Sequence, residues 1–104
     1  MIKTILLVIS VASLAWAAGD AAAGKAVYDK ACKSCHGADG AGNPNIAKMM
    51  KVEMKSLASG EVQKRSDADL KKVIEEGEGK MKPVKTVAGK DVDNVIAYVR
   101  SLKK

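Results

Sequence analysis

Residues 32–36 read CKSCH, which places two thiols about one helical turn apart with an imidazole directly behind the second. A run of this kind is typical of a redox disulfide, of part of a zinc site, or of an attachment point for haem. The first needs strands around it, the second needs further ligands, and the third brings in a large apolar group. The rest of the chain therefore decides which fold surrounds the motif.

Residues 1–17 have the pattern of a secretory signal peptide. Lys3 supplies a positive start, residues 5–15 form a short apolar run, and Ala-Trp-Ala at 15–17 fits a small-x-small cleavage site. The apolar run is too short to span a membrane, although a retained N-terminal anchor helix is an alternative. We expect cleavage to leave residues 18–104 as a single soluble periplasmic domain without membrane insertion.

This domain is short of large apolar side chains. It has no Phe, its only Trp is Trp16 of the leader, and Tyr28 and Tyr98 are the remaining aromatic residues. A domain of 87 residues buries a modest core and usually needs a covalent cross-link or a bound metal for stability. A bulky apolar group must therefore supply volume that the side chains do not.

The charge of the domain argues for a protein partner. Loss of Lys3 from the 18 basic residues leaves the 12 acidic residues unchanged, so the domain carries a net charge of +5. Lysine dominates over arginine, which suits a salt-sensitive encounter with an acidic protein better than rigid phosphate recognition. The lysines are scattered and no aromatic side chains interleave with them, so nucleic acid is not an expected partner.

Hydrophobic spacing predicts an all-α fold of four short helices and long loops, without strands. Glycine, proline and a Ser-x-x-Asp cap mark their limits. The helices are expected between Gly24 and Gly37, between Pro44 and Gly60, between Ser66 and Gly77, and from Val92 to Leu102. Loops this long in a small domain are uncommon unless they wrap a ligand.

This pattern favours the haem interpretation of CKSCH. A redox disulfide lacks its strand–helix–strand surroundings, and a zinc site lacks a second pair of ligands. Two thiols one turn apart reach both vinyl groups of a haem, and the next residue presents its imidazole to the iron. We therefore predict one covalently bound haem c, with thioethers from Cys32 and Cys35 and with His36 as an axial iron ligand.

The sixth iron ligand must come from another residue type, because His36 is the only histidine. A methionine, a lysine, water and an open position are the alternatives. Met81 lies in the loop GEGKMKPV, where it serves no helical stripe, and we predict it as the second axial ligand. Three further methionines fall at helical spacing and are interpreted as flexible core filler: Met49, Met50 and Met54.

Over nearly all of residues 18–104 the sequence resembles the class I cytochromes c, in particular short-chain bacterial periplasmic monohaem proteins. The resemblance rests on CKSCHG, the Pro44-Asn45 step, the GEGKM loop and the terminal helix VDNVIAYVRSL. It implies that the first and last helices cross, with Gly24 and Tyr28 against Ala97 or Tyr98. It also implies that the Pro44 carbonyl accepts a hydrogen bond from Nδ1 of His36 and so fixes the ring.

Two departures from the family pattern bear on the site. Lys82 separates Met81 from Pro83, whereas many relatives place proline directly after the ligand. The domain also lacks the tryptophan that larger members set against a haem propionate. Three residues before the third helix are candidates for that polar contact: Gln63, Lys64 and Arg65.

The expected function is one-electron transfer between periplasmic redox proteins by a monomer that is not an enzyme. Lysines near the haem edge are expected to steer acidic partners: Lys33, Lys48, Lys80, Lys82 and Lys85. A haem peroxidase or gas-binding protein with a labile sixth ligand is one alternative, although no distal His or Arg constellation is evident. The cytochrome subunit of a larger oxidoreductase complex is another.

Overall fold

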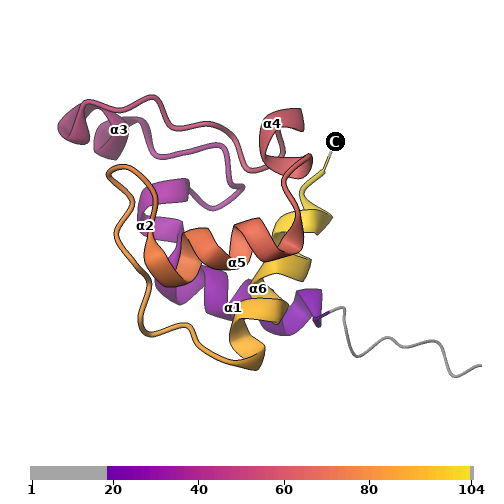
Figure 1. Cartoon of the computed structure of the whole chain (residues 1–104). Coiled ribbons are helices and arrows are strands. Elements are labelled where there is room, and N and C mark those ends of the chain that lie inside the picture. Colours follow the sequence, from indigo (N-terminus) through magenta and orange to yellow (C-terminus); the bar gives the residue numbers. More distant parts are fainter. Residues whose placement is uncertain (1–18, 104) are drawn as a thin grey trace, which may run out of the picture.

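The structure is a computed structural model that describes residues 19–103, and it consists of helices joined by long loops (Figure 1). The predicted leader lies outside the described residues. The helices are α1 (Ala21–Ala31), α2 (Lys33–His36), α3 (Pro44–Met50), α4 (Gly60–Gln63), α5 (Asp67–Glu76) and α6 (Lys90–Ser101). Strand-like pairing within residues 19–103 is limited to one isolated bridge between Glu78 and Met81, so the all-α prediction is confirmed.

Side-chain caps mark the start of four of the six described helices. The Asp20 carboxylate accepts the first free N–H groups of α1, and the Ser66 hydroxyl accepts the Asp69 N–H of α5. Asn43 caps α3, whose first residue is Pro44. Each cap satisfies a donor that the helix itself leaves unpaired, and proline suits the first helical position because it has no N–H. The predicted cap at Ser66 is thus confirmed.

The predicted helix between Gly24 and Gly37 is interrupted at Cys32. This residue has φ −121° and ψ −30°, which ends α1 at Ala31 and starts the short α2 at Lys33. Its N–H still bonds to the Tyr28 carbonyl, so the chain turns without losing that contact. The motif therefore lies on a separate turn of helix rather than along one continuous helix.

The predicted second helix is shorter than expected. It ends at Met50 because Lys51 adopts a left-handed conformation, with φ 54° and ψ 47°, which stops an α-helix. Met54 and Leu57 consequently lie in an irregular segment, and a short helix that was not predicted, α4, follows Ser59. The Ser59 hydroxyl caps α4 by accepting the Val62 N–H.

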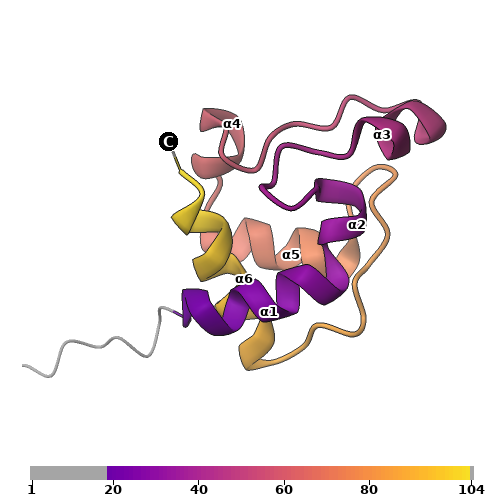
Figure 2. The same cartoon turned by 180° about the vertical axis from the view of Figure 1, so that it is seen from behind.

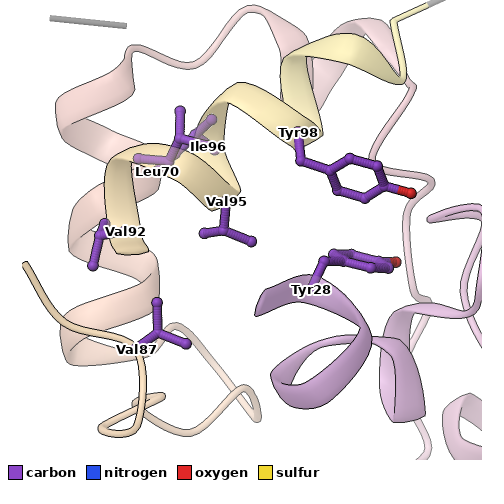
Figure 3. Packing of buried hydrophobic residues seen from close by; sticks show 7 residues of the cluster. All are labelled: Tyr28, Leu70, Val87, Val92, Val95, Ile96 and Tyr98. Carbon is purple, nitrogen blue, oxygen red and sulfur yellow. The ribbon is translucent and has the colours of Figure 1, made fainter. Parts of the chain in front are cut away.

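The core forms where α1 and α6 cross, the most extensive contact between helices (Figure 3). A Cβ atom at Gly24 would overlap the backbone carbonyl of Asn94, so only glycine permits this approach. The rings of Tyr28 and Tyr98 lie 4.9 Å apart between centroids and are tilted by 53°, a favourable aromatic arrangement. The crossing implied by the family resemblance is confirmed, with Asn94 as an additional contact.

Buried apolar residues are confined to one part of the molecule. They are Tyr28, Leu70, Val87, Val92, Val95, Ile96 and Tyr98. None of the buried residues lies on α2, α3 or α4, and α3 lies away from the group of α1, α5 and α6 in both views (Figures 1 and 2). Met49 is 71% exposed on α3, so its interpretation as core filler is wrong.

The described helices are also short. The longest, α6, has 12 residues. Between residues 19 and 103 no helix has the length and apolar character needed to cross a membrane.

Candidate functional site

A cavity of about 600 Å³ lies between the packed helices and the loops that face them. Its size is within the range of roughly 300–1,000 Å³ that is typical of pockets for small molecules and cofactors. Its wall is mainly apolar, with contributions from Ala31, Val52, Leu57, Val62, Leu70, Val73, Ile74, Val95, Ile96 and Val99. Helices α1, α4, α5 and α6 and the loops opposite them therefore surround a space suited to a large apolar group.

The motif CKSCH forms one wall of this cavity. Cys32, Cys35 and His36 all line it. The His36 N–H bonds to the Cys32 carbonyl at 3.0 Å, which keeps the two thiols and the imidazole on one turn. The Tyr28 hydroxyl donates to the Gly37 carbonyl at 2.6 Å and thereby joins the end of the motif to α1.

The following loop folds back on the motif and fixes it from the other side. The N–H groups of Gly42 and Asn43 donate to the carbonyls of His36 and Cys35, at 2.7 and 2.9 Å. The Asn43 side chain also donates to the Ser34 carbonyl at 3.1 Å. These hydrogen bonds thus fix the backbone of the motif independently of a cofactor.

Burial controls the electrostatics of this wall. It raises the pKa of the Cys32 thiol to about 11, with a smaller contribution from the charge of Cys35. Burial also lowers the pKa of His36, which keeps the imidazole neutral at physiological pH. Neutral imidazole is the form that binds metals, so the site favours His36 as a ligand.

Met81 forms part of the cavity wall, although it is far from His36 in the sequence. Its loop begins after α5 and is closed by two backbone hydrogen bonds, from Glu78 N–H to the Met81 carbonyl and from Met81 N–H to the Glu78 carbonyl. Gly77 has φ +80°, and a Cβ atom there would come 2.5 Å from the Met81 carbonyl oxygen. This turn therefore depends on glycine.

Two further methionines line the same cavity. Met50 comes from the end of α3 and Met54 from the irregular segment beyond it, and both are partly buried. Their predicted role as flexible filler agrees with this placement, even though Met54 lies outside a helix. The cavity wall thus offers three thioethers, and only that of Met81 belongs to a closed turn.

Pro44 does not line the cavity. It is the first residue of α3 and is exposed. Within residues 19–103, the buried Nδ1 atom of His36 has no hydrogen-bond partner. The hydrogen bond from this atom to the Pro44 carbonyl therefore stays a prediction, which requires the proton of the imidazole to be on Nδ1.

Only Arg65 of the three candidates for a propionate contact lines the cavity. Gln63 instead donates to the carbonyls of Leu57 and Val99, at 2.8 and 2.9 Å, which joins the end of the irregular segment to α6. Lys64 is exposed and does not line the cavity. The propionate contact itself stays a prediction for Arg65.

Arg65 is the centre of an ionic cluster at the cavity edge. Its guanidinium binds both carboxylate oxygens of Glu78 at 2.7 Å and the Asp69 carboxylate at 2.5 Å. Hydrogen bonds from Arg65 hold the pKa values of Glu78 and Asp69 below their ordinary range. Sequence spacing did not predict the Arg65–Glu78 pair, because Arg65 precedes α5 in the sequence and Glu78 follows it.

The predicted steering lysines divide into two groups. Lys80 and Lys82 line the cavity, together with Lys55, which was not predicted. Lys80 is also bonded to the Met50 carbonyl at 2.6 Å, so it links the Met81 loop to the end of α3. The other three are exposed and lie outside the cavity: Lys33, Lys48 and Lys85.

Comparison with known proteins agrees with this geometry. Residues 21–103 match the family model described as Cytochrome c. The chain belongs to the cytochrome c family. It is 37% identical over 101 aligned residues to cytochrome c-554(547) of Halothiobacillus neapolitanus, an alignment that covers 83% of this chain and the whole of that protein.

Solved structures give the same result. The c-type cytochrome KustC0563 is 31% identical, with a TM-score of 0.66, over 78% of this chain and 98% of its own. Cytochrome CL from Methylophaga aminisulfidivorans MPT has a TM-score of 0.60 over 80% of this chain and 53% of its own, and at 24% identity it supports the fold alone. The resemblance to class I c-type cytochromes is thus confirmed.

Membership in this family identifies the cofactor as covalently attached haem c with its iron, and one haem suits a domain of this size. The residues present fit such a group. The cavity has a largely apolar wall, a pair of thiols and a neutral imidazole on one side, and thioether sulfurs on others. Electron transport is the role of the family, and the chain is a monohaem c-type cytochrome.

Proposed function

We propose that this cytochrome carries single electrons between periplasmic redox proteins, with its haem iron held between His36 and Met81. The observation that supports this most is that the motif residues Cys32, Cys35 and His36 line one apolar cavity with Met81, which is distant in the sequence. A thiol pair, an imidazole and a thioether are the donor set of a covalently bound, low-spin electron-transfer haem.

Each of these residues has a distinct task. The haem supplies an iron that alternates between its ferric and ferrous states. Cys32 and Cys35 would attach the group as thioethers, so that a small domain does not lose it. His36 and Met81 would hold the iron in both oxidation states, and their turns are fixed by backbone hydrogen bonds. The apolar wall excludes water, which keeps reorganisation during transfer small.

The ligand assignment is tested by the absorption spectrum of the ferric Met81→Ala protein. Loss of the weak far-red band that is characteristic of ferric methionine ligation is expected, because no other sulfur takes the axial position. Met50→Ala and Met54→Ala are matched controls, since both methionines line the same cavity, and each should keep the band. Survival of the band in Met81→Ala, or its loss in a control, would show that the assignment is wrong.

The same spectra test the alternative of a peroxidase or gas-binding protein. A haem with two permanent ligands should be low-spin as the ferric protein and should bind carbon monoxide slowly as the ferrous protein. A high-spin ferric spectrum and rapid carbon monoxide binding in the wild type would instead favour the alternative.

We propose that the partners present acidic docking surfaces and that the protein acts as a monomer exported to the periplasm. The net charge of the domain and the lysines at the cavity edge support this. Opposite charges accelerate encounter, and salt screens them over about 10 Å at 0.1 M. The rate of electron exchange with an acidic redox protein should therefore fall as ionic strength rises. A rate independent of salt would rule out electrostatic steering.

A further inference from the structure

We infer that Arg65 and Glu78 form a positioning clamp that holds the Met81 loop against the cavity. The clamp determines how readily an external ligand displaces the Met81 thioether from iron. This inference rests on the proposed function, because it takes Met81 as the sixth ligand. Arg65 and Glu78 act through Met81 and are positioning residues.

The clamp connects a helical part of the protein to a loop. Arg65 precedes α5, and its Nε atom donates to the Asp69 carboxylate in the first turn of that helix at 2.5 Å. Its two terminal nitrogens each donate to one carboxylate oxygen of Glu78 at 2.7 Å. A two-pronged pair of this type fixes direction as well as distance, because the guanidinium is planar. The start of α5 thus sets the position of Glu78.

Glu78 in turn sets the position of Met81. Their backbones exchange two hydrogen bonds, at 3.0 and 2.9 Å, in a turn that depends on Gly77. A displacement of Glu78 therefore carries Met81 with it. Glu78 and Met81 both line the cavity. A shift of this turn would therefore change the position of the Met81 side chain in the cavity wall.

Two other contacts hold the same loop. Lys80 donates to the Met50 carbonyl at 2.6 Å, and the Val84 N–H donates to the Ile74 carbonyl at 2.8 Å. The Arg65 side chain is 30% exposed and the Glu78 side chain 55% exposed, so solvent weakens their attraction. The clamp is thus one of three attachments, and its loss should loosen the Met81 loop without unfolding the domain.

The test is a titration of the ferric holoprotein with imidazole, which competes with Met81 for the sixth position. Glu78→Gln should bind imidazole roughly fivefold more tightly than the wild type, a modest effect suited to a half-exposed ion pair. Arg65→Lys should change the affinity in the same direction, because lysine keeps the charge but loses the two-pronged geometry. Glu76→Gln is the matched control, since it removes the same charge from an exposed position at the end of α5, and its affinity should stay that of the wild type.

The possible outcomes separate the clamp from the ligand assignment. If Met81→Ala loses the far-red band while Glu78→Gln and Arg65→Lys bind imidazole like the wild type, the clamp is wrong and the ligand assignment stands. If Met81→Ala keeps the band, the ligand assignment fails and the clamp fails with it. An equal increase in Glu76→Gln would assign the effect to net charge and overturn the clamp. Denaturant unfolding of each variant excludes a general loss of stability as the cause.

Discussion

The two sides of this cytochrome are stabilised in different ways. Where α1 and α6 cross, Tyr28, Val92 and Val95 are fully or almost fully buried against other side chains. Across the cavity, α3 and the segment 51–59 bury no apolar residue, and Met49 of α3 is 71% exposed. The first side is stabilised by its own side chains, whereas the second has the cavity proposed for haem where its core would be. On that proposal, the cofactor is a structural partner for the second side.

The largest expected effect comes from preventing haem attachment with Cys32→Ser and Cys35→Ser together. Without haem, the mainly apolar wall of a cavity of about 600 Å³ would face water, which removes a large part of the burial behind the roughly 5–15 kcal/mol that stabilises a typical domain. The cavity loops should therefore collapse or unfold. Amide hydrogen exchange should show loss of protection first in residues 37–59 and last in α1 and α6.

Single variants provide the control for this experiment. Cys32→Ser or Cys35→Ser alone leaves one thiol for attachment and should retain more protection than the double variant. If residues 37–59 of the haem-free double variant were as protected as those of the wild type, the contrast between the two sides would be wrong.

A smaller effect is expected on the packed side from Gly24→Ala. The new Cβ would overlap the Asn94 carbonyl, so α1 and α6 must separate, at a cost of about 1–3 kcal/mol. Denaturant unfolding measures this loss. The far-red band should be unchanged, because neither residue lines the cavity.

Gly60→Ala is the matched control for Gly24→Ala. A Cβ at Gly60 has nothing within 4 Å, so this substitution makes the same change at a helical residue without the overlap. Gly60 is the first residue of the short α4, where the gain in helix propensity is smaller than inside a helix. Gly60→Ala should change stability by less than about 0.5 kcal/mol. Equal effects at Gly24 and Gly60 would contradict the close approach of α1 and α6.

The contrast between the packed side and the cavity side also explains which elements could be predicted from the sequence. The stripe of Val92, Val95 and Ile96 repeats at helical spacing because these residues pack against other helices, and α6 was predicted from it. The cap at Ser66 is also a local signal and located the start of α5 correctly. CKSCH and the loop that carries Met81 were recognised from their own residues, and both line one cavity in the structure. The hydrogen bonds that close this loop between Glu78 and Met81 were not predicted.

On the cavity side the pattern was misleading. Met50, Met54 and Leu57 repeat at helical spacing and predicted a longer helix, but they line the cavity and the chain beyond Met50 is irregular. The bonds that shape this side join distant residues, such as the Leu57 N–H to the Gly40 carbonyl and Gln63 to the Val99 carbonyl. Local spacing carries no signal for contacts of this kind, so the end of α3 and the presence of α4 were not predicted.

The smallest effect is expected from Tyr28→Phe, which tests the hydrogen bond that connects α1 to the loop after CKSCH. This change removes the 2.6 Å hydrogen bond from the Tyr28 hydroxyl to the Gly37 carbonyl and should cost about 1 kcal/mol at neutral pH. The fully buried ring keeps its contact with Tyr98, so the loss is that of the bond alone. Denaturant unfolding at pH 7 measures it.

The pH dependence of this difference gives a second check. Burial, followed by smaller contributions from neighbouring negative charges, raises the pKa of Tyr28 from its ordinary value of 10.0 to about 12 in the folded protein. The folded state thus keeps a proton that the unfolded state releases, and the stability of the wild type must fall as pH rises from about 10 to about 12. Tyr28→Phe lacks this titration, so its stability should approach that of the wild type over that window. A difference that stays constant to pH 12 would show that burial does not raise the pKa of Tyr28 in the folded protein.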